Sequence, residues 1–207
     1  MHFLITAGPT REYIDPVRFI SNASSGKTGL ALTLAALSAG HKVTLITTTT
    51  NIKPPAKANL VFAETAEEMF TAVKKYFGKC DCLIMAAAVA DYTPARPAKF
   101  KIKKSNQPLF IKLKPTPDIL KWAAAHKKKN QRVVGFALED KNIRKNAEKK
   151  LKNKNLDMII ANTPASIGSD KTEVYIKTVN TEWLKISAAP KNVVAAGIIR
   201  LIEKLFS

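Results

Sequence analysis

Cysteine and histidine are scarce in this chain, whose 207 residues include two cysteines and three histidines. Cys80 and Cys82 flank Asp81, and neither a second cysteine pair nor clustered histidines complete the four ligands of a structural zinc site. On a strand, alternation would point both thiols to the same face. We therefore expect two buried strand residues in a reducing compartment, and metal or redox chemistry is the less favoured alternative.

Long apolar runs are also missing. Residues 1–5 carry no basic leader, and their apolar stretch ends at Thr6, which is too early for a signal peptide or a membrane span. The sequence therefore predicts a cytoplasmic protein with no membrane partner. A hydrophobic content of 46% suffices for one substantial core, so we expect one domain over residues 1–207.

Acidic residues are few beside basic ones, 16 against 34, which gives a net charge of +18. From Lys99 to Lys154 there are 18 basic residues and four acidic ones. This surplus suits a polynucleotide, but equally a nucleoside triphosphate and a phosphorylated substrate. Aromatic residues make up only 7% and do not interleave with the basic ones. No nucleic acid partner is expected, and a basic nucleic-acid-binding module is kept as an alternative.

Strand-length apolar runs alternate with helical patterns along the chain. This alternation predicts an α/β fold in which a doubly wound, Rossmann-like and mostly parallel sheet is flanked by helices. The expected strands are Phe3–Thr6, Val43–Ile46, Cys82–Ala87, Val133–Phe136 and Met158–Ala161.

The helical segments are recognised by apolar positions on one face and by start or stop signals at their ends. They span Lys27–Ser38, Ala66–Phe77, Lys141–Asn153 and Lys191–Phe206. Pro117 indicates another capped helix start, at the first helical position. The runs 173–179 and 183–186 predict a C-terminal β-hairpin. Residues 93–113, rich in lysine, form a long irregular connection of the kind that acts as a lid.

Residues 18–29 form a polar loop that ends at the first predicted helix. Backbone N–H groups and the positive end of the helix dipole can hold a phosphate or a carboxylate there. Ligands of open α/β sheets bind outside the carboxyl ends of the strands. The segments in that position are 7–29, 86–92, 137–140 and 162–170, and together they outline one site that includes Ala86 and Asn162.

Two common nucleotide motifs do not fit the opening loop. Residues 26–28 read Gly-Lys-Thr as in a P-loop, but Ser21 stands where that motif needs a glycine. A dinucleotide fingerprint needs three spaced glycines directly after the first strand, and only two glycines have that spacing. A short-chain dehydrogenase would also need a lysine four residues after Tyr76 or Tyr92, which is missing. An NAD(P)-dependent oxidoreductase is therefore the second alternative.

Nucleophiles are scarce in the strand-end loops. His2, His41 and His126 all lie outside them, and the loops offer amides, hydroxyls, lysines, an arginine and the carboxylate of Asp91. That inventory favours positioning and charge neutralisation over covalent catalysis, as in nucleotidyl transfer.

Several motifs follow one another in order along nearly the whole chain: ITAGPTRE at residue 5, IDPVRFISN at 14, SSGK at 24, AAAVADY at 86, KIKK at 101, PDI at 117, VGFA at 134, NLD at 155 and GSD at 168. This series resembles phosphopantothenoylcysteine synthetase, or phosphopantothenate–cysteine ligase, of the bacterial CTP-dependent type. In many bacteria that enzyme is the C-terminal half of a protein whose N-terminal half is a flavin-dependent decarboxylase. Because the motifs begin at residue 5, we expect a stand-alone synthetase without flavin and a separate phosphopantothenoylcysteine decarboxylase in the same pathway.

The resemblance implies a two-step ligase of coenzyme A biosynthesis. The carboxylate of 4′-phosphopantothenate attacks the α-phosphate of CTP, with Mg²⁺ assisting, to give an acyl-cytidylate and pyrophosphate. The amine of L-cysteine then displaces CMP and forms the amide. The resemblance gives no metal ligands, and nothing in the residues themselves distinguishes CTP from ATP.

Matching motifs also imply roles for single residues. Asn22 binds the pantothenate portion and steadies the acyl-cytidylate, and Lys101 neutralises phosphate charge; both are the expected catalytic residues. Arg18 reaches the phosphopantothenate of a neighbouring subunit, which implies a homodimer. Substrate-lining residues are Ala87, Ala88 and Asp91. The nucleotide-binding positions are Ser24, Gly26, Gly29, Ala86, Ala87, Asp91, Lys101, Pro117, Asp118, Ile119, Leu120, Phe136, Lys150, Lys154 and Asn162.

Simpler structural roles stay open for some of these positions. Phe136 ends an apolar run and suits the core. Lys150 and Lys154, four residues apart on a helix, suit a solvated face. Gly26 and Gly29 suit close packing of a helix.

Overall fold

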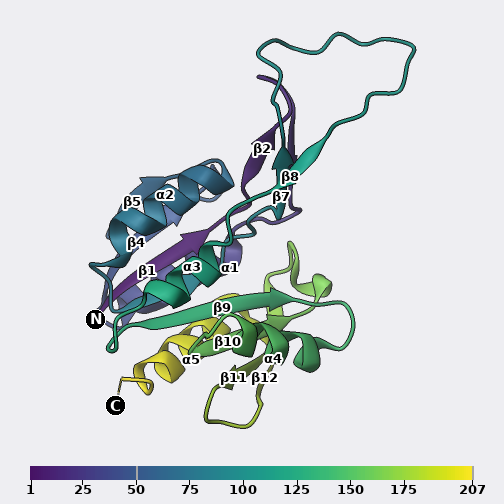
Figure 1. Cartoon of the computed structure of the whole chain (residues 1–207). Helices are drawn as coiled ribbons and strands as arrows, with labels where there is room; N and C mark the ends of the chain where they lie inside the picture. Colours follow the sequence, from purple (N-terminus) through teal and green to yellow (C-terminus); the bar gives the residue numbers. More distant parts are fainter. Residues whose placement is uncertain (50, 207) are drawn as a thin grey trace.

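The computed structural model describes residues 1–49 and 51–206. The strands of its central sheet are β1 (His2–Ala7), β4 (Lys42–Thr47), β5 (Asn59–Phe62), β6 (Cys82–Met85), β9 (Arg132–Leu138), β10 (Met158–Asn162), β11 (Lys171–Thr178) and β12 (Leu184–Pro190). Their order across the sheet is β12-β11-β10-β9-β6-β1-β4-β5 (Figure 1). All pairings are parallel except those of β11 with β10 and β12, so the predicted mostly parallel sheet with a C-terminal hairpin is confirmed.

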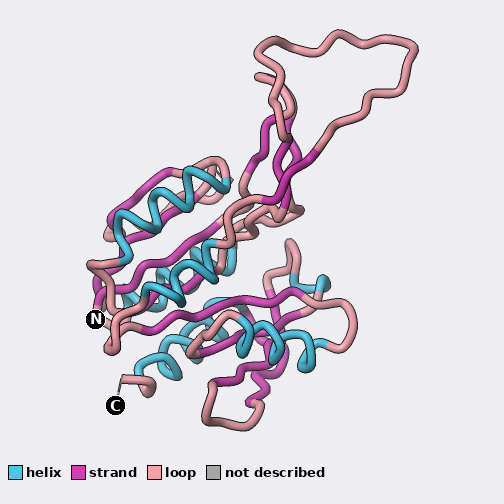
Figure 2. Tube along the Cα trace, in the orientation of Figure 1, coloured by secondary structure: helices cyan, strands magenta, loops and turns pink. Residues whose placement is uncertain are grey.

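Helices cover both faces of this sheet, as Figure 2 shows. They are α1 (Lys27–Ser38), α2 (Ala66–Phe77), α3 (Ile119–His126), α4 (Ile143–Asn153) and α5 (Lys191–Glu203), with a short 3-10 helix, η1 (Pro164–Ser166). α1 and α5 pack together over one face, while α2, α3 and α4 share a core with the other face. The doubly wound α/β prediction is therefore confirmed.

The apolar run of β1 shows why the sheet needs two helical layers. Phe3, Leu4 and Ile5 are all fully buried. Phe3 and Ile5 pack in the cluster under α1 and α5, while Leu4 packs in the cluster under α2, α3 and α4. Because successive strand residues point to opposite faces, a continuous apolar strand must be covered on both sides.

Two details of the helices differ from the prediction. Pro117 is not the first helical residue, since α3 begins at Ile119. Asp118 is its N-cap, and an Asp118 carboxylate oxygen accepts the Lys121 N–H at 3.0 Å. A capping carboxylate satisfies a free N–H at the helix start and places the proline before the cap. α4 begins two residues later than predicted, at Ile143, and α5 ends at Glu203 rather than at residue 206.

The two cysteines are buried as predicted, but their placement was predicted wrongly. Cys82 opens β6, whereas Cys80 precedes the strand, in the turn after α2. They belong to different core clusters, on opposite faces of the sheet. Burial raises the pKa of the Cys80 thiol to about 12 and also raises the pKa of Cys82, so both thiols stay protonated and unreactive.

Two small ribbons project beyond the carboxyl ends of the central strands (Figure 1). One pairs β2 (Arg11–Tyr13) with β3 (Phe19–Ser21), and the other pairs β7 (Tyr92–Pro94) with β8 (Leu113–Pro115). We call these four strands, the turn 14–18 and the loop 95–112 the arm. The predicted irregular stretch 93–113 is therefore paired at both of its ends, and only its middle is an open loop.

The description omits residues 50 and 207, both of which fall within the predicted domain 1–207. Among the helices of the described residues, none is long and apolar enough to cross a membrane.

Candidate functional site

The strand order places a crevice at the carboxyl ends of β1 and β6. The chain leaves β1 toward β4 on one side and leaves β6 toward β9 on the other, so the loops after β1 and β6 diverge. Two buried threonines join these loops, because Thr6 Oγ1 accepts the Ala87 N–H at 3.1 Å and Thr10 Oγ1 accepts the Ala90 N–H at 3.0 Å. The motifs ITAGPTRE and AAAVADY are thus halves of one wall.

A pocket of about 450 Å³ lies against this wall, and we call it the strand-end pocket. Its lining comes from the loop after β1, the start of α1, the loop after β6, the end of β9, α4, the segment after β10 and the start of α5. The lining residues are Asn22, Ala23, Ser24, Ser25, Gly26, Lys27, Thr28, Ala86, Ala87, Ala88, Val89, Asp91, Phe136, Leu138, Lys150, Asn162, Ser166, Ile167, Gly168 and Lys191.

Ten of the predicted site residues line this pocket: Asn22, Ser24, Gly26, Ala86, Ala87, Ala88, Asp91, Phe136, Lys150 and Asn162. The others, which do not line it, are Arg18, Gly29, Lys101, Pro117, Asp118, Ile119, Leu120 and Lys154. Ile119 and Leu120 are buried in the core under α3, where each contributes to packing. Sequence reasoning did not single out Lys191, whose only signal was its place at the start of the last predicted helix.

Asn22 lies where the two loops meet. Its amide nitrogen Nδ2 donates to the carbonyl oxygens of Ala88 and Val89, both at 3.2 Å. Those contacts orient the amide and leave its oxygen free to accept from a ligand. Asn22 thus ties the loop before α1 to the loop after β6 and presents a polar group to the pocket.

The start of α1 supplies backbone donors. Gly26 is its N-cap and has a φ of 77°, a left-handed conformation that glycine adopts without strain. It has no side chain to cap the first turn, so no cap side chain occupies the N–H groups there, and Gly26, Lys27 and Thr28 line the pocket. Gly29 lies behind them, and a Cβ at this position would come within 2.5 Å of the Ala7 Cβ. Its packing role therefore explains this glycine directly.

A basic side chain, that of Lys150, borders the pocket from α4. Lys150 Nζ donates to the Phe136 carbonyl oxygen at 2.8 Å, and burial, followed by the nearby charge of Lys154, lowers the pKa of Lys150. Lys154 Nζ pairs with an Asp118 carboxylate oxygen at 2.8 Å. Burial raises the pKa of Asp118, but hydrogen bonds from Lys154 and the Lys121 N–H outweigh it, and the net pKa is lowered. Lys150 is therefore not merely a solvated lysine.

Arg18 and Lys101 lie on the arm rather than in the pocket. The Arg18 guanidinium pairs with the buried carboxylate of Asp15 and donates to the Ile102 carbonyl oxygen at 2.8 Å. Asp15 also accepts the N–H groups of Ile102 at 3.1 Å and of Val17 at 2.9 Å. Ile102, the residue next to Lys101, is thus anchored through its N–H by Asp15 and through its carbonyl oxygen by Arg18.

Asp15→Asn is expected to lower the melting temperature at pH 7. The hydrogen bonds from Arg18 hold the pKa of Asp15 well below its usual range, so its contribution to stability is present above the unfolded value of about 3.9 and declines as the pH falls toward the folded pKa. The difference between wild type and variant should therefore narrow below about pH 4. Thermal melts at pH 7, 5 and 3 measure it, and a constant difference would contradict this role.

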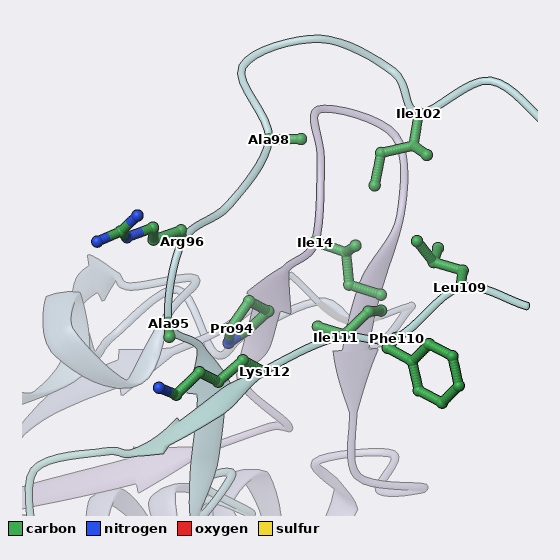
Figure 3. Close-up of a pocket in the computed structure, with 10 residues that line it drawn as sticks. All are labelled: Ile14, Pro94, Ala95, Arg96, Ala98, Ile102, Leu109, Phe110, Ile111 and Lys112. Carbon is green, nitrogen blue, oxygen red and sulfur yellow. The ribbon is translucent and has the colours of Figure 1, made fainter.

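A second hollow, of about 550 Å³, lies in the arm between Ile14 and the loop 95–112 (Figure 3). Ile102, Leu109 and Ile111 line it, and its charged side chains are Arg96 and Lys112. It contains no carboxylate, and its apolar lining makes it a packing surface rather than a catalytic pocket.

A family model described as DNA/pantothenate metabolism flavoprotein C-terminal domain matches residues 1–206. The chain belongs to this family. The coenzyme A biosynthesis bifunctional protein CoaBC of Borreliella burgdorferi is 42% identical over 202 residues, covering 96% of this chain and 51% of that protein. A cysteine/cysteine sulfinic acid decarboxylase from an unknown prokaryotic organism is 44% identical over 206 residues, covering 97% of this chain and 57% of that protein. The chain thus spans about half the length of these relatives.

The fold of this family member also agrees with a solved relative. The crystal structure of the C-terminal domain of a CoaBC protein aligns with a TM-score of 0.85 and 36% identity, covering 99% of this chain and 94% of that one. The match supports the mostly parallel sheet with flanking helices.

Carboxylates are few in the strand-end pocket of this family member. Across residues 1–49 and 51–206, no group of three or more His, Cys, Asp or Glu side chains could hold a metal ion. Asp91 is the acidic residue of the pocket lining, and it is exposed. One carboxylate fits a Mg²⁺ ion that keeps several waters and is bound mainly through substrate phosphates.

Proposed function

We propose that this protein is the ligase of coenzyme A biosynthesis that joins 4′-phosphopantothenate to L-cysteine at the expense of CTP. The observation that carries the proposal is the strand-end pocket itself, because motifs from residues 22–28, 86–91, 136, 150 and 162 converge on it. The chain belongs to the pantothenate metabolism family and aligns with about half of a CoaBC protein of coenzyme A biosynthesis, which supports the same reaction. The shared Rossmann-like strand order would by itself indicate only the fold.

The first step needs a carboxylate and a triphosphate, both anionic, to approach each other. The N–H groups at the start of α1 and the hydroxyl of Ser24 hold the phosphates, while the free amide oxygen of Asn22 accepts from a hydroxyl or amide N–H of the pantothenate portion. The carboxylate oxygen bonds to the α-phosphorus, and the bond to the bridging oxygen breaks, so that its electron pair leaves with pyrophosphate. Catalysis here is positioning and charge neutralisation in a preorganised pocket.

The second step forms the amide. The cysteine nitrogen attacks the acyl carbon of the cytidylate, a proton leaves that nitrogen, and CMP departs with the carbon–oxygen electron pair. Ala87, Ala88 and Asp91 line the part of the pocket beside Asn22 where this occurs. Phe136, Lys150 and Asn162, which line the pocket from β9, α4 and β10, receive the nucleotide, with Lys154 and Asp118 near Lys150.

Mg²⁺ bound to the triphosphate would reduce its negative charge, with Asp91 as the protein ligand available to it. Lys101 stands on the arm loop, and we propose that it reaches the phosphates when that loop folds over the pocket as a lid. No flavin is part of the proposed reaction. We propose that the protein acts in the cytoplasm. A separate phosphopantothenoylcysteine decarboxylase would then consume its product.

We also propose a homodimer formed through the arm, in which Arg18 serves the phosphopantothenate of the neighbouring subunit. Phe110 and Phe100 on the arm are 90% and 83% exposed. Large apolar side chains that are this exposed indicate an interaction site, and a second copy of this chain is the occupant that the Arg18 role requires.

Phe110→Asp is expected to convert the dimer to a monomer, because the charge would be buried in an apolar contact. Size-exclusion chromatography with light scattering measures the mass. Val179→Asp is the matched control, since Val179 is 68% exposed at the tip of the C-terminal hairpin and should leave the dimer intact. A monomeric wild type, or an unchanged mass in Phe110→Asp, would contradict the arm interface.

The reaction is tested with purified protein, 4′-phosphopantothenate, L-cysteine, Mg²⁺ and either CTP or ATP. We expect CMP and pyrophosphate to appear in equal amounts with the amide product. AMP release in its place would overturn the nucleotide assignment alone. Absence of any nucleotide cleavage would overturn the ligase.

A further inference from the structure

Two lysines in the strand-end pocket have no role in the proposal so far. Lys27 is the first residue of α1 and Lys191 is the first residue of α5. Both line the pocket, although 164 positions separate them in the sequence. α1 packs against α5, and the first turns of both helices line the same pocket.

Both lysines hold the segment that follows β10. Lys27 Nζ lies 2.6 Å from an Asp170 carboxylate oxygen and 3.3 Å from the Gly168 carbonyl oxygen. Lys191 Nζ donates to the Ser166 carbonyl oxygen at 3.0 Å. The segment 166–170 therefore covers the outer edge of the pocket through contacts made by two ammonium groups.

The charges in this contact are not balanced. Asp170 pairs with Lys27, and its side chain is 88% exposed, so water screens its charge. Burial, followed by the nearby charge of Lys27, lowers the pKa of Lys191. Lys191 thus keeps a partly buried cation beside another cation, with a neutral carbonyl oxygen as its hydrogen-bond acceptor.

Holding a loop does not require this arrangement. Lys27 and Asp170 alone would make an ordinary surface ion pair, and an apolar residue at position 191 would remove a desolvated, repelled charge. Two converging ammonium groups with one exposed carboxylate instead provide positive potential for a polyanion. The nucleotide of the proposed ligase is such a polyanion, and the first turn of α1, which has no side-chain cap, begins at Lys27, five residues after Asn22.

The geometry points to Lys27 and Lys191 as a clamp for the two terminal phosphates of the nucleotide, and hence for the pyrophosphate leaving group. This assignment rests on the proposed nucleotide-dependent ligation. The α-phosphate then lies on the Asn22 side, where the acyl group is held. When the bond between the α-phosphorus and the bridging oxygen breaks, the electron pair moves onto pyrophosphate, where the two ammonium groups stabilise it without any proton transfer. The phosphates displace Asp170 and the two carbonyl oxygens as partners of the lysines.

Calorimetric titration of CTP, CMP and inorganic pyrophosphate into the full chain, in phosphate-free buffer, tests the clamp. We expect Lys191→Met to weaken CTP and pyrophosphate binding about 10-fold or more, which corresponds to loss of a charge-assisted hydrogen bond, and to leave CMP binding within about 2-fold. Lys27→Met should act in the same direction. Lys204→Met is the matched control, because Lys204 is exposed at the other end of α5 and should change none of the three.

The outcomes separate the clamp from the ligase. If Lys191→Met leaves the ratio of the CTP and CMP affinities unchanged, the clamp is overturned, even if the protein forms the amide. Failure of the wild type to bind pyrophosphate would overturn it as well. If the wild type binds pyrophosphate but forms no amide, and Lys191→Met loses that binding, the clamp stands and the ligase is overturned. If Lys191→Met does not fold, as judged by circular dichroism, Lys27→Met decides the question with the same three titrations.

Discussion

Asn22→Asp is expected to reduce the rate of pyrophosphate release in the first step by about 100-fold or more, the range found when one preorganised polar group is lost at a reacting centre. The Asn22 amide donates to the carbonyl oxygens of Ala88 and Val89. A carboxylate cannot donate to either oxygen, and its charge would repel both the substrate carboxylate and the nucleotide phosphates. The variant therefore alters the junction of the two loops and the electrostatics of the first chemical step together.

Single-turnover release of pyrophosphate measures this effect, because pyrophosphate leaves in the first step, before the amide forms and CMP departs. Asn180→Asp is the matched control: Asn180 is exposed in the turn of the C-terminal hairpin, where the same change of charge should leave the rate unaltered. If Asn22→Asp turns over at the wild-type rate, the assignment of Asn22 to the reacting centre is wrong. Unchanged thermal unfolding would show that a lost rate is not a lost fold.

Gly29→Ala is expected to destabilise the protein by about 1–3 kcal/mol, which lowers the melting temperature by roughly 2–12 °C in a chain of this size. The new methyl group would meet the Ala7 Cβ at 2.5 Å and the Ala7 Cα at 2.9 Å. Since backbone cannot move aside as a flexible side chain does, α1 would have to shift away from β1. The same shift would displace the N–H groups of its first turn.

Gly78→Ala is the control for this prediction. An added Cβ there meets nothing within 4 Å, and Gly78 has a φ of −65° that alanine adopts freely. It should therefore be neutral or slightly stabilising. Thermal melts of the two variants make the comparison. Equal melting temperatures for Gly29→Ala and wild type would show that α1 does not need the close approach to Ala7.

Elements with strong apolar periodicity could be predicted from the sequence. The five predicted strands of the parallel sheet all form, because continuous apolar runs such as residues 3–5 can be buried only between two layers. β5 was missed because it is an edge strand, in which Leu60 and Phe62 are exposed and the pattern of burial is weak. The short strands of the arm were missed because strands of three residues leave almost no pattern.

Local signals misled where a contact distant in sequence or a competing cap decides the structure. Alternation alone placed the two cysteines on one face, but β6 begins only at Cys82, and Cys80 packs under α2 through the preceding turn. The proline signal at 117 gave way to capping by Asp118, whose carboxylate is further held by Lys154 on α4. Neither outcome could be read from the nearest neighbours.

The sequence by itself determined the layered fold and the order of the polar loops, because strand and helix periodicity and the position of loops at strand ends are local properties of the chain. Only the tertiary structure decided which of those loops meet. Buried threonines fasten the segments after β1 and β6 to each other, and the packing of α1 on α5 places Lys191 beside Lys27. Contacts between residues that lie 80 or 160 positions apart depend on how helices and strands pack, so local sequence patterns cannot predict them.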